Sequence, residues 1–258
     1  MNKLKEIYAY REMIISLVRK ELRGRYKGSV LGFLWTFLNP LLQLMVYTLV
    51  FSVILRAGIE NYYLFLFVAL IPWLFFSSSV AAGSSCIIHQ KDLVKKIYFP
   101  REVLPISHVT TCFINMLLTF IVIFLVIIFS GIGINLNAIL YLPVIMVVEY
   151  ILALGMAMIF SALTVFLRDL EYILGIVIMA WQFLTPIMYS IDIVPEKIMP
   201  IFMANPMTPI IIAYRDILYY KQIPELGTLL HALILGIVIL FIGGIVFNKL
   251  QKRFAEEL

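Results

Sequence analysis

Long uncharged apolar runs, separated by short polar segments, dominate the pattern of this chain. Residues 28–55 contain no Asp, Glu, Lys or Arg, and neither do residues 61–88. Each run exceeds the roughly 20 residues with which an α-helix crosses the hydrocarbon core of a membrane. Residues 103–148 also lack these four residue types, and this run is too long for one crossing. The pattern predicts an all-α integral membrane protein.

A turn must divide the third run, and its most turn-prone stretch is Ser130-Gly131-Ile132-Gly133-Ile134-Asn135. Small, flexible residues there favour a tight hairpin between two helices. The fourth helix then continues to about Leu167, directly before Arg168-Asp169. We predict one transmembrane domain over residues 1–258 with six spans: 28–55, 61–88, 103–130, 138–167, 172–190 and 227–248.

Lys and Arg residues gather on one side of the predicted membrane. Sixteen of the twenty lie in segments that share a side with the N-terminus, and four lie on the other side. Because Lys and Arg are enriched in cytoplasmic loops, both termini are expected in the cytoplasm. The segments on that side are residues 1–27, 89–102, 168–171 and the tail 249–258.

The outer segment 191–226 separates spans five and six. Within it residues 198–214 are uncharged, but Pro200, Pro206 and Pro209 interrupt them and Asn205-Pro206 is a turn signal. We therefore predict two short amphipathic or re-entrant helices rather than a seventh span. They are candidates for a gate over an exit path, or for a cap that seals the helix ends. The gate residues would be Pro195, Asn205 and Pro206.

Residues 4–27 have the periodicity of an amphipathic helix, with apolar positions such as Ile7, Ile14 and Leu22 at helical spacing. Its basic residues predict a helix on the cytoplasmic membrane surface, apolar side in lipid. The helix could serve only as an anchor, or it could also help dock a partner. Arg25 and Lys27 are candidates to meet an anionic lipid head group or a substrate phosphate.

The cytoplasmic loop 89–102 combines apolar and basic residues before Pro100. The spacings Leu93–Ile97 and Val94–Tyr98 place apolar side chains on one helical face. A solvated connector is one interpretation, but an exposed apolar cluster favours a surface that docks a partner. The predicted docking residues are Lys91, Asp92, Leu93, Val94, Lys95, Lys96, Ile97, Tyr98 and Phe99.

The composition narrows the function. The chain is 63% hydrophobic and 14% charged, with a formal net charge of +5, which excludes an ordinary soluble domain. Cys86 and Cys112 predict neither a disulfide framework nor a metal site, and the three histidines show no ligand spacing. No G-x-x-x-x-G-K-[ST] motif or catalytic cluster is present. We expect no catalytic residue, no metal and no bound cofactor in this chain.

Aromatic residues make up 14% of the chain. Aromatic rings stack on the apolar faces of sugars, so these residues could line a glycan path. Rings near span ends also form interfacial belts, which is the simpler explanation for each one alone. The candidates on spans one and five are Trp35, Phe37, Tyr47, Phe51, Trp181, Phe183 and Tyr189.

Glu149 is the only acidic residue deep within an apolar run. A charge at that depth is costly and usually faces a partner or a cavity. A structural contact between helices is the favoured interpretation, with substrate contact as the alternative.

An ordered set of fragments resembles the ABC-2 type permeases that export cell-surface polysaccharides such as O-antigen, capsule and teichoic acid. The fragments are Arg25-Tyr26-Lys27-Gly28-Ser29-Val30-Leu31-Gly32-Phe33-Leu34-Trp35 with Asn39-Pro40-Leu41, Tyr98-Phe99-Pro100-Arg101-Glu102-Val103-Leu104-Pro105, Phe166-Leu167-Arg168-Asp169-Leu170, and Thr185-Pro186-Ile187-Met188-Tyr189 with Pro195 and Asn205-Pro206-Met207. Together they cover nearly the whole chain in order.

The resemblance implies a homodimer in a bacterial inner membrane, assembled with two copies of a separate ATPase that binds ATP and Mg²⁺. The loop at 91–99 would be the coupling helix, and a lipid-linked glycan would pass between the two copies. The resemblance implies no nucleic-acid partner. Rival functions are an ABC-2 exporter of drugs or small lipids and a secondary transporter, although the latter should show internal repeats and more ionisable residues within its spans.

Overall fold

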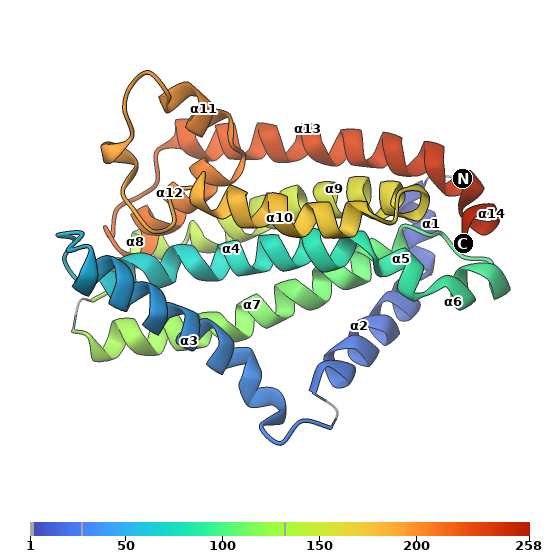
Figure 1. Ribbon diagram of the computed structural model, residues 1–258, viewed down its shortest axis with the longest axis horizontal. Helices are drawn as coiled ribbons and strands as arrows, with labels where there is room; N and C mark the ends of the chain where they lie inside the picture. Colours follow the sequence, from blue (N-terminus) through green and yellow to red (C-terminus); the bar gives the residue numbers. More distant parts are fainter. Residues whose placement is uncertain (1–2, 27, 132) are drawn as a thin grey trace.

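The computed structural model describes residues 3–26, 28–131 and 133–258. Helices account for 79% of the chain, and the described residues contain no β-strand. Figure 1 shows an elongated bundle with both chain termini at one end. The predicted all-α membrane class is confirmed. Within the described residues, five helical segments are long and apolar enough to cross a membrane: Gly32–Ile54, Tyr62–Ser84, Val103–Phe129, Leu136–Phe166 and Leu226–Glu257.

The elements fall into three groups along the bundle (Figure 1). The long helices are α3 (Trp35–Thr48, flanked by η1, Gly32–Leu34, and η2, Leu49–Ile54), α4 (Tyr62–Ser84), α7 (Val103–Phe129), α9 (Leu142–Phe166), α10 (Leu170–Phe183) and α13 (Leu226–Leu250). The end with both termini carries α1 (Lys3–Ala9), α2 (Arg11–Tyr26), α5 (Cys86–His89), α6 (Lys91–Lys96), η4 (Gln251–Arg253) and α14 (Phe254–Glu257). The opposite end carries α8 (Leu136–Ile139), η3 (Ile191–Ile193), α11 (Met199–Ala204) and α12 (Met207–Leu218).

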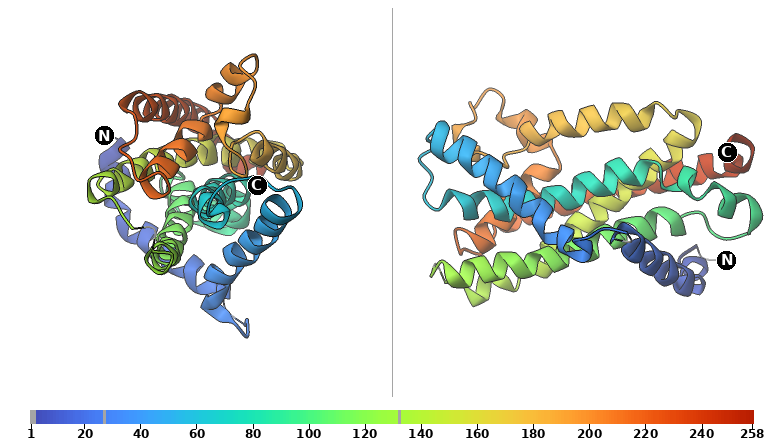
Figure 2. Two further views of the ribbon diagram at one scale, coloured as in Figure 1. Left: turned by 90° about the vertical axis from the view of Figure 1, so that its left-hand side faces the viewer. Right: turned by 60° about the horizontal axis from the view of Figure 1, so that its bottom comes forward.

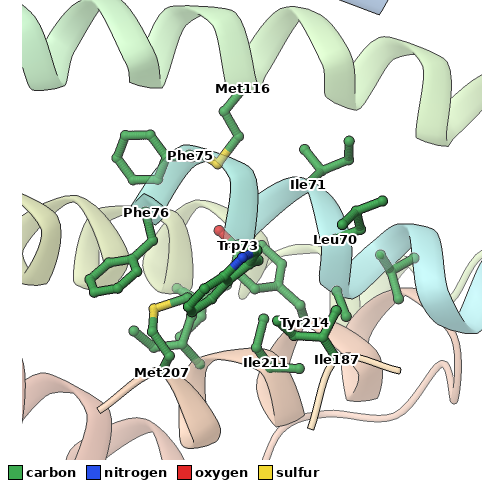
Figure 3. Packing of buried hydrophobic residues seen from close by; sticks show 14 of the residues in the cluster. Leu70, Ile71, Trp73, Phe75, Phe76, Met116, Ile187, Met207, Ile211 and Tyr214 are labelled. Carbon is green, nitrogen blue, oxygen red and sulfur yellow. The ribbon is translucent and has the colours of Figure 1, made fainter. Parts of the chain in front are cut away.

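Helix α4 forms the centre of the bundle. It packs against α9, α7, α3, α12 and α10, and 78% of its apolar window is buried. Its aromatic side chains occupy both sides of the helix. Figure 3 shows Trp73 above Ile211 and Tyr214 of α12, while Phe75 lies on the side that faces Met116 of α7. Because every face of α4 meets protein, its all-round hydrophobicity is that of a buried helix.

Two glycines bring α9 and α13 into close contact. A Cβ atom at Gly155 would lie 2.6 Å from the backbone nitrogen of Leu240, and one at Gly243 would lie 2.5 Å from the carbonyl oxygen of Gly155. Small residues at a crossing let two membrane helices approach closely and gain van der Waals contact. This crossing attaches α13 to the bundle, although only 17% of its apolar window is buried.

The predicted hairpin after the third span is confirmed. Helix α7 ends at Phe129, and Gly131 (φ +68°) and Gly133 (φ +80°) adopt left-handed backbone conformations that favour glycine. Ile132 lies outside the described residues. The side chain of Asn135 accepts hydrogen bonds from the backbone N–H groups of Asn137 and Ala138, which caps α8 before α9 begins.

The predicted fifth span, residues 172–190, is only partly helical. Helix α10 has 14 residues and ends at Phe183, followed by turns to residue 190. The two short helices predicted within residues 198–214 are present as α11 and α12, with the break at Asn205-Pro206. However, α12 is not an interfacial helix, because it packs against α4, α9 and α13 and nearly all of it is buried.

The N-terminal amphipathic helix is present in two pieces, α1 and α2. The apolar face of this helix was expected to lie in lipid. That expectation is wrong for the residues that pack against the bundle. Val18 is buried, and Tyr10, Ile14 and Leu17 pack against a cluster formed by the termini-bearing ends of α7, α9 and α13. Burial against these helices removes the same apolar surface from water that lipid would have covered.

Candidate functional site

The predicted docking segment lies at the end of the bundle that holds both termini (Figure 1). Val94 and Phe99 are buried, so they anchor the segment to the bundle. Helix α6 ends at Lys96 and Ile97 is extended, although the Ile97 N–H still donates to the carbonyl of Leu93, so Ile97 and Tyr98 lie beyond the helix. Both side chains face outward, 56% and 87% exposed. Four charged neighbours are also exposed: Lys91, Asp92, Lys95 and Lys96.

A buried carboxylate ties this loop to both chain termini. The Oε1 atom of Glu102 lies 2.9 Å from Nζ of Lys3 and accepts a hydrogen bond from Nε2 of Gln251 at 3.0 Å. Arg101 donates to the carbonyl of Gln251. Phe254 of α14 is fully buried against Phe247. The sequence analysis missed this connection, because its partners are about 100 and 150 positions away along the chain.

An ion pair fastens α2 to α7. Oε1 of Glu21 lies 2.8 Å from Nδ1 of His108, whose Nε2 atom is 3.5 Å from the carbonyl of Ser78. His108 is thus part of a helix–helix contact. Arg25 lies in α2, but the structure describes only its backbone, and Lys27 lies outside the described residues. Their role at a head group therefore stays a prediction.

The aromatic candidates of the first span are spread along it rather than gathered. Trp35 is about one-third exposed, and its indole N–H donates to Oγ of Ser29 at 3.1 Å. Phe37 makes an edge contact with Phe33. Tyr47 accepts a hydrogen bond from Gln182 of α10, and Phe51 stacks on Tyr62 of α4.

The candidates of α10 and the following turn lie in the half of the molecule near α11 and α12. The Trp181 ring packs edge-on against Phe76 at a centroid distance of 5.2 Å, and its N–H donates to Oδ1 of Asn205 at 2.9 Å. Tyr189 donates to the carbonyl of Phe183 at 2.7 Å. The Phe183 ring is 55% exposed. Trp181 thus has a packing role, while Phe183 faces the surroundings.

Asn205 lies between the two short helices, after the end of α11 and before the start of α12. Its Nδ2 atom donates to the carbonyl of Leu184 at 3.2 Å and to Oγ1 of Thr185 at 2.9 Å. Its Oδ1 atom accepts the backbone N–H of Met207 at 3.0 Å as well as the Trp181 indole. The predicted turn residue therefore links α10, the following turn and α12. Pro206 precedes α12 with a φ of −64°, and Pro195 is exposed.

Arg215 of α12 is a second link, and the sequence analysis assigned it to an outer loop. It is 3% exposed, and its guanidinium donates to the carbonyls of Pro186, Ile187, Tyr189 and Phe65. The guanidinium carbon also lies 3.6 Å from the centroid of the Phe65 ring. Its position directly after the uncharged residues 198–214 is the feature of the sequence that could have indicated its burial.

Glu149 makes the structural contact that was favoured for it. The carboxyl is fully buried, and its Oε2 atom accepts a hydrogen bond from the hydroxyl of Tyr214 at 2.7 Å. The pair joins α9 to α12. Oε1 has no hydrogen-bond partner among the described residues.

Residues 12–219 match the family model described as ABC-2 type transporter. The chain is 35% identical to the O-antigen export system permease protein RfbA of Myxococcus xanthus over 99% of this chain and 98% of that protein. It is 36% identical to a protein of the same name from Klebsiella pneumoniae, over 96% of this chain and 95% of that one. The polysialic acid transport protein KpsM of Escherichia coli is 23% identical over 88% and 89%.

These similarities extend over the termini-bearing end, the central helices and the short helices α11 and α12 alike. The family match alone covers well over half of the chain. Helices long and apolar enough to cross a membrane agree with it. The chain belongs to the ABC-2 type transporter family of membrane permeases.

Proposed function

We propose that this chain is the permease subunit of an ATP-driven exporter that moves a lipid-linked polysaccharide out of the cytoplasm. The observation that carries the proposal is the identity of about one third, over nearly the full length, to permeases named for O-antigen export. The glycan would be of the O-antigen, capsule or teichoic acid type. The chain would act as a homodimer in a bacterial inner membrane, with two copies of a cytoplasmic ATPase that bind ATP and Mg²⁺.

A sixth crossing is formed by α10 together with residues 184–190. The 14 residues of α10 extend about 21 Å at 1.5 Å per residue, which is shorter than a hydrocarbon core of about 30 Å. Non-helical backbone is tolerated at membrane depth only where protein satisfies its polar groups. Arg215 donates to three carbonyls of this segment, and Tyr62 donates to a fourth, that of Met188, at 2.7 Å.

Six crossings place both termini on one side, in agreement with their common end in Figure 1. That end also carries most of the Lys and Arg residues, which favours the cytoplasm. The segment 91–99 then faces the cytoplasm, where Ile97 and Tyr98 offer apolar contact and Lys95 and Lys96 offer charge to the ATPase. Helices α11 and α12 lie at the outer end, where they serve as the gate.

Export by the complete complex tests this proposal. The chain is co-expressed with its ATPase in cells that synthesise the glycan, and surface glycan is measured. Export should require ATP hydrolysis, and it should fall to background in the variant with Lys95→Glu, Lys96→Glu and Ile97→Asp, because the docking surface loses its charge and apolar contact. A matched control is Lys197→Glu, an exposed lysine at the other end of the bundle. Unchanged export by the triple variant would refute the docking role.

A further inference from the structure

A cavity of about 480 Å³ lies between α3, α4 and α7. This volume is within the range of small-molecule sites, roughly 300–1,000 Å³. The three helices contribute six polar side chains to its lining: Thr36, Asn39, Gln43, Ser78, Asn115 and Thr119. Polar side chains are costly within the hydrocarbon core, so their convergence from three helices favours a ligand with hydrogen-bonding groups.

Pro40 of α3 lines the cavity. Proline has no N–H, so Pro40 cannot donate a hydrogen bond to the carbonyl of Thr36. The hydroxyl of Thr119 donates to this carbonyl at the long distance of 3.5 Å, and to the carbonyl of Asn115 at 2.9 Å.

Two amides in the lining are without protein partners. The side chains of Asn39 and Gln43 make no hydrogen bond to any residue that the structure describes, although both sit on the α3 face that borders the cavity. Asn39 is exposed and Gln43 is partly exposed, so both amides open onto the cavity, where lipid would offer them no hydrogen bond. A bound hydroxyl-rich group would satisfy both amides.

The described residues that line the cavity include no Asp, Glu, Lys, Arg or His. A phosphate would therefore meet no cation here, whereas a neutral sugar would meet amides and hydroxyls that donate and accept hydrogen bonds. The rings of Trp35 and Phe75 also line the cavity, and Figure 3 shows Phe75 on the α7 side of α4. Aromatic rings provide flat apolar surfaces for the faces of a sugar.

We propose that this cavity binds one neutral sugar residue of the exported glycan, inside a single subunit. The inference rests on the proposed function and names a contact for its substrate. Ser78 lies six residues before the end of α4, and Asn115 lies in the first half of α7. The cavity therefore belongs to the half of the bundle near the termini, where a substrate from the cytoplasmic leaflet arrives.

The first test is export by the assembled complex with the double variant Asn39→Leu and Gln43→Leu. Its export rate should fall about tenfold, as expected when two neutral hydrogen bonds to the ligand are lost. The control is Thr48→Val, which removes a hydroxyl from α3 outside the cavity. Wild-type export by the double variant would overturn the sugar site but leave the exporter intact. A wild-type chain that exports no glycan would instead overturn the proposed function itself.

The second test detects the sugar directly. In a complex with Cys86→Ala and Cys112→Ala, a cysteine at Gln43 is labelled with a maleimide in nanodiscs. Undecaprenyl pyrophosphate bearing one N-acetylglucosamine should slow the labelling about tenfold, whereas undecaprenyl pyrophosphate alone should not. Labelling at Leu117→Cys, on the exposed side of α7, should be unaffected by either lipid. Equal rates at position 43 with both lipids would show a cavity that holds only water, and would overturn the proposal.

Discussion

Helices α3 and α4 have nearly the same sequence character but opposite places in the molecule. Both belong to uncharged apolar segments of 23 residues, yet 78% of the α4 window is buried and only 11% of the α3 window. Figure 2 shows α3 at the margin of the bundle, where it meets α2 at an angle, while α4 runs through the middle. Lipid tails are as apolar as the side chains in a protein core. Hydrophobicity alone therefore does not determine whether a helix lies at the centre or at the margin of the bundle.

The centre and the margin of the bundle differ in how their small and polar residues are used. The centre of the bundle is held by close backbone contact and by buried groups with several partners, such as Gly155 and Arg215. The margin has a polar cavity beside Asn39 and Gln43 and an apolar outer face that includes Met45 and Val46, 65% and 57% exposed. A change in the packed centre should therefore affect folding, and a change at the margin should affect transport.

The largest effect is expected where α9 crosses α13. Gly243→Val would force a Cβ into the space 2.5 Å from the carbonyl oxygen of Gly155, so the helices must separate. We expect a loss of more than about 3 kcal/mol in stability, at the upper end of overpacking effects. Thermal unfolding in detergent would measure it. Gly244→Val is the matched control, because a Cβ there meets nothing within 4 Å; equal behaviour of the two variants would contradict the close crossing.

Arg215→Met should have the second largest effect. It leaves the carbonyls of Pro186, Ile187 and Tyr189 without their donor, at a cost of about 2–4 kcal/mol. Arg215→Lys should recover only part of this loss, because an ammonium cannot reproduce the planar guanidinium fork. Proteolysis of residues 184–190 and the melting temperature would report the effect. Lys197→Met, at an exposed position, is the control; a melting temperature of Arg215→Met equal to that of the control would remove Arg215 as a link.

The same substitution at two tryptophans should give opposite results. Trp181→Ala removes a ring packed on Phe76 and a hydrogen bond to Asn205, so stability should fall by about 2–3 kcal/mol. Trp35→Ala, at the margin, should leave the melting temperature unchanged and reduce glycan export. Melting curves and export assays on both variants test the contrast. Normal glycan export by the Trp35→Ala variant, or a wild-type melting temperature of the Trp181→Ala variant, would contradict this contrast.

Local patterns predicted much of this fold. Uncharged runs predicted the long helices, and the glycines after Phe129 predicted the hairpin. Asn205-Pro206 predicted the break between α11 and α12. These features depend on neighbours along the chain. The early end of α10, the burial of Arg215 and the link from Glu102 to Lys3 and Gln251 depend on distant partners, which hydropathy does not contain.

The candidate site was predicted less completely, for the same reason. Ile97 and Tyr98 are exposed as the docking hypothesis requires, but Val94 and Phe99 serve as anchors. The aromatic residues were grouped by type, and only their contacts distinguish the packed Trp181 from the half-exposed Phe183. The polar cavity joins residues of three helices separated by about 80 positions, so no single segment reveals it.

Co-purification would show whether this permease works with a separate ATPase. The chain, tagged after Leu258, is purified from its native membrane in mild detergent, and its partners are identified and counted. We expect a complex with two copies of this chain and two copies of an ATPase, and we expect the variant Ile97→Asp to lose the ATPase. A stable monomer without an ATPase would contradict this expectation and favour a secondary transporter.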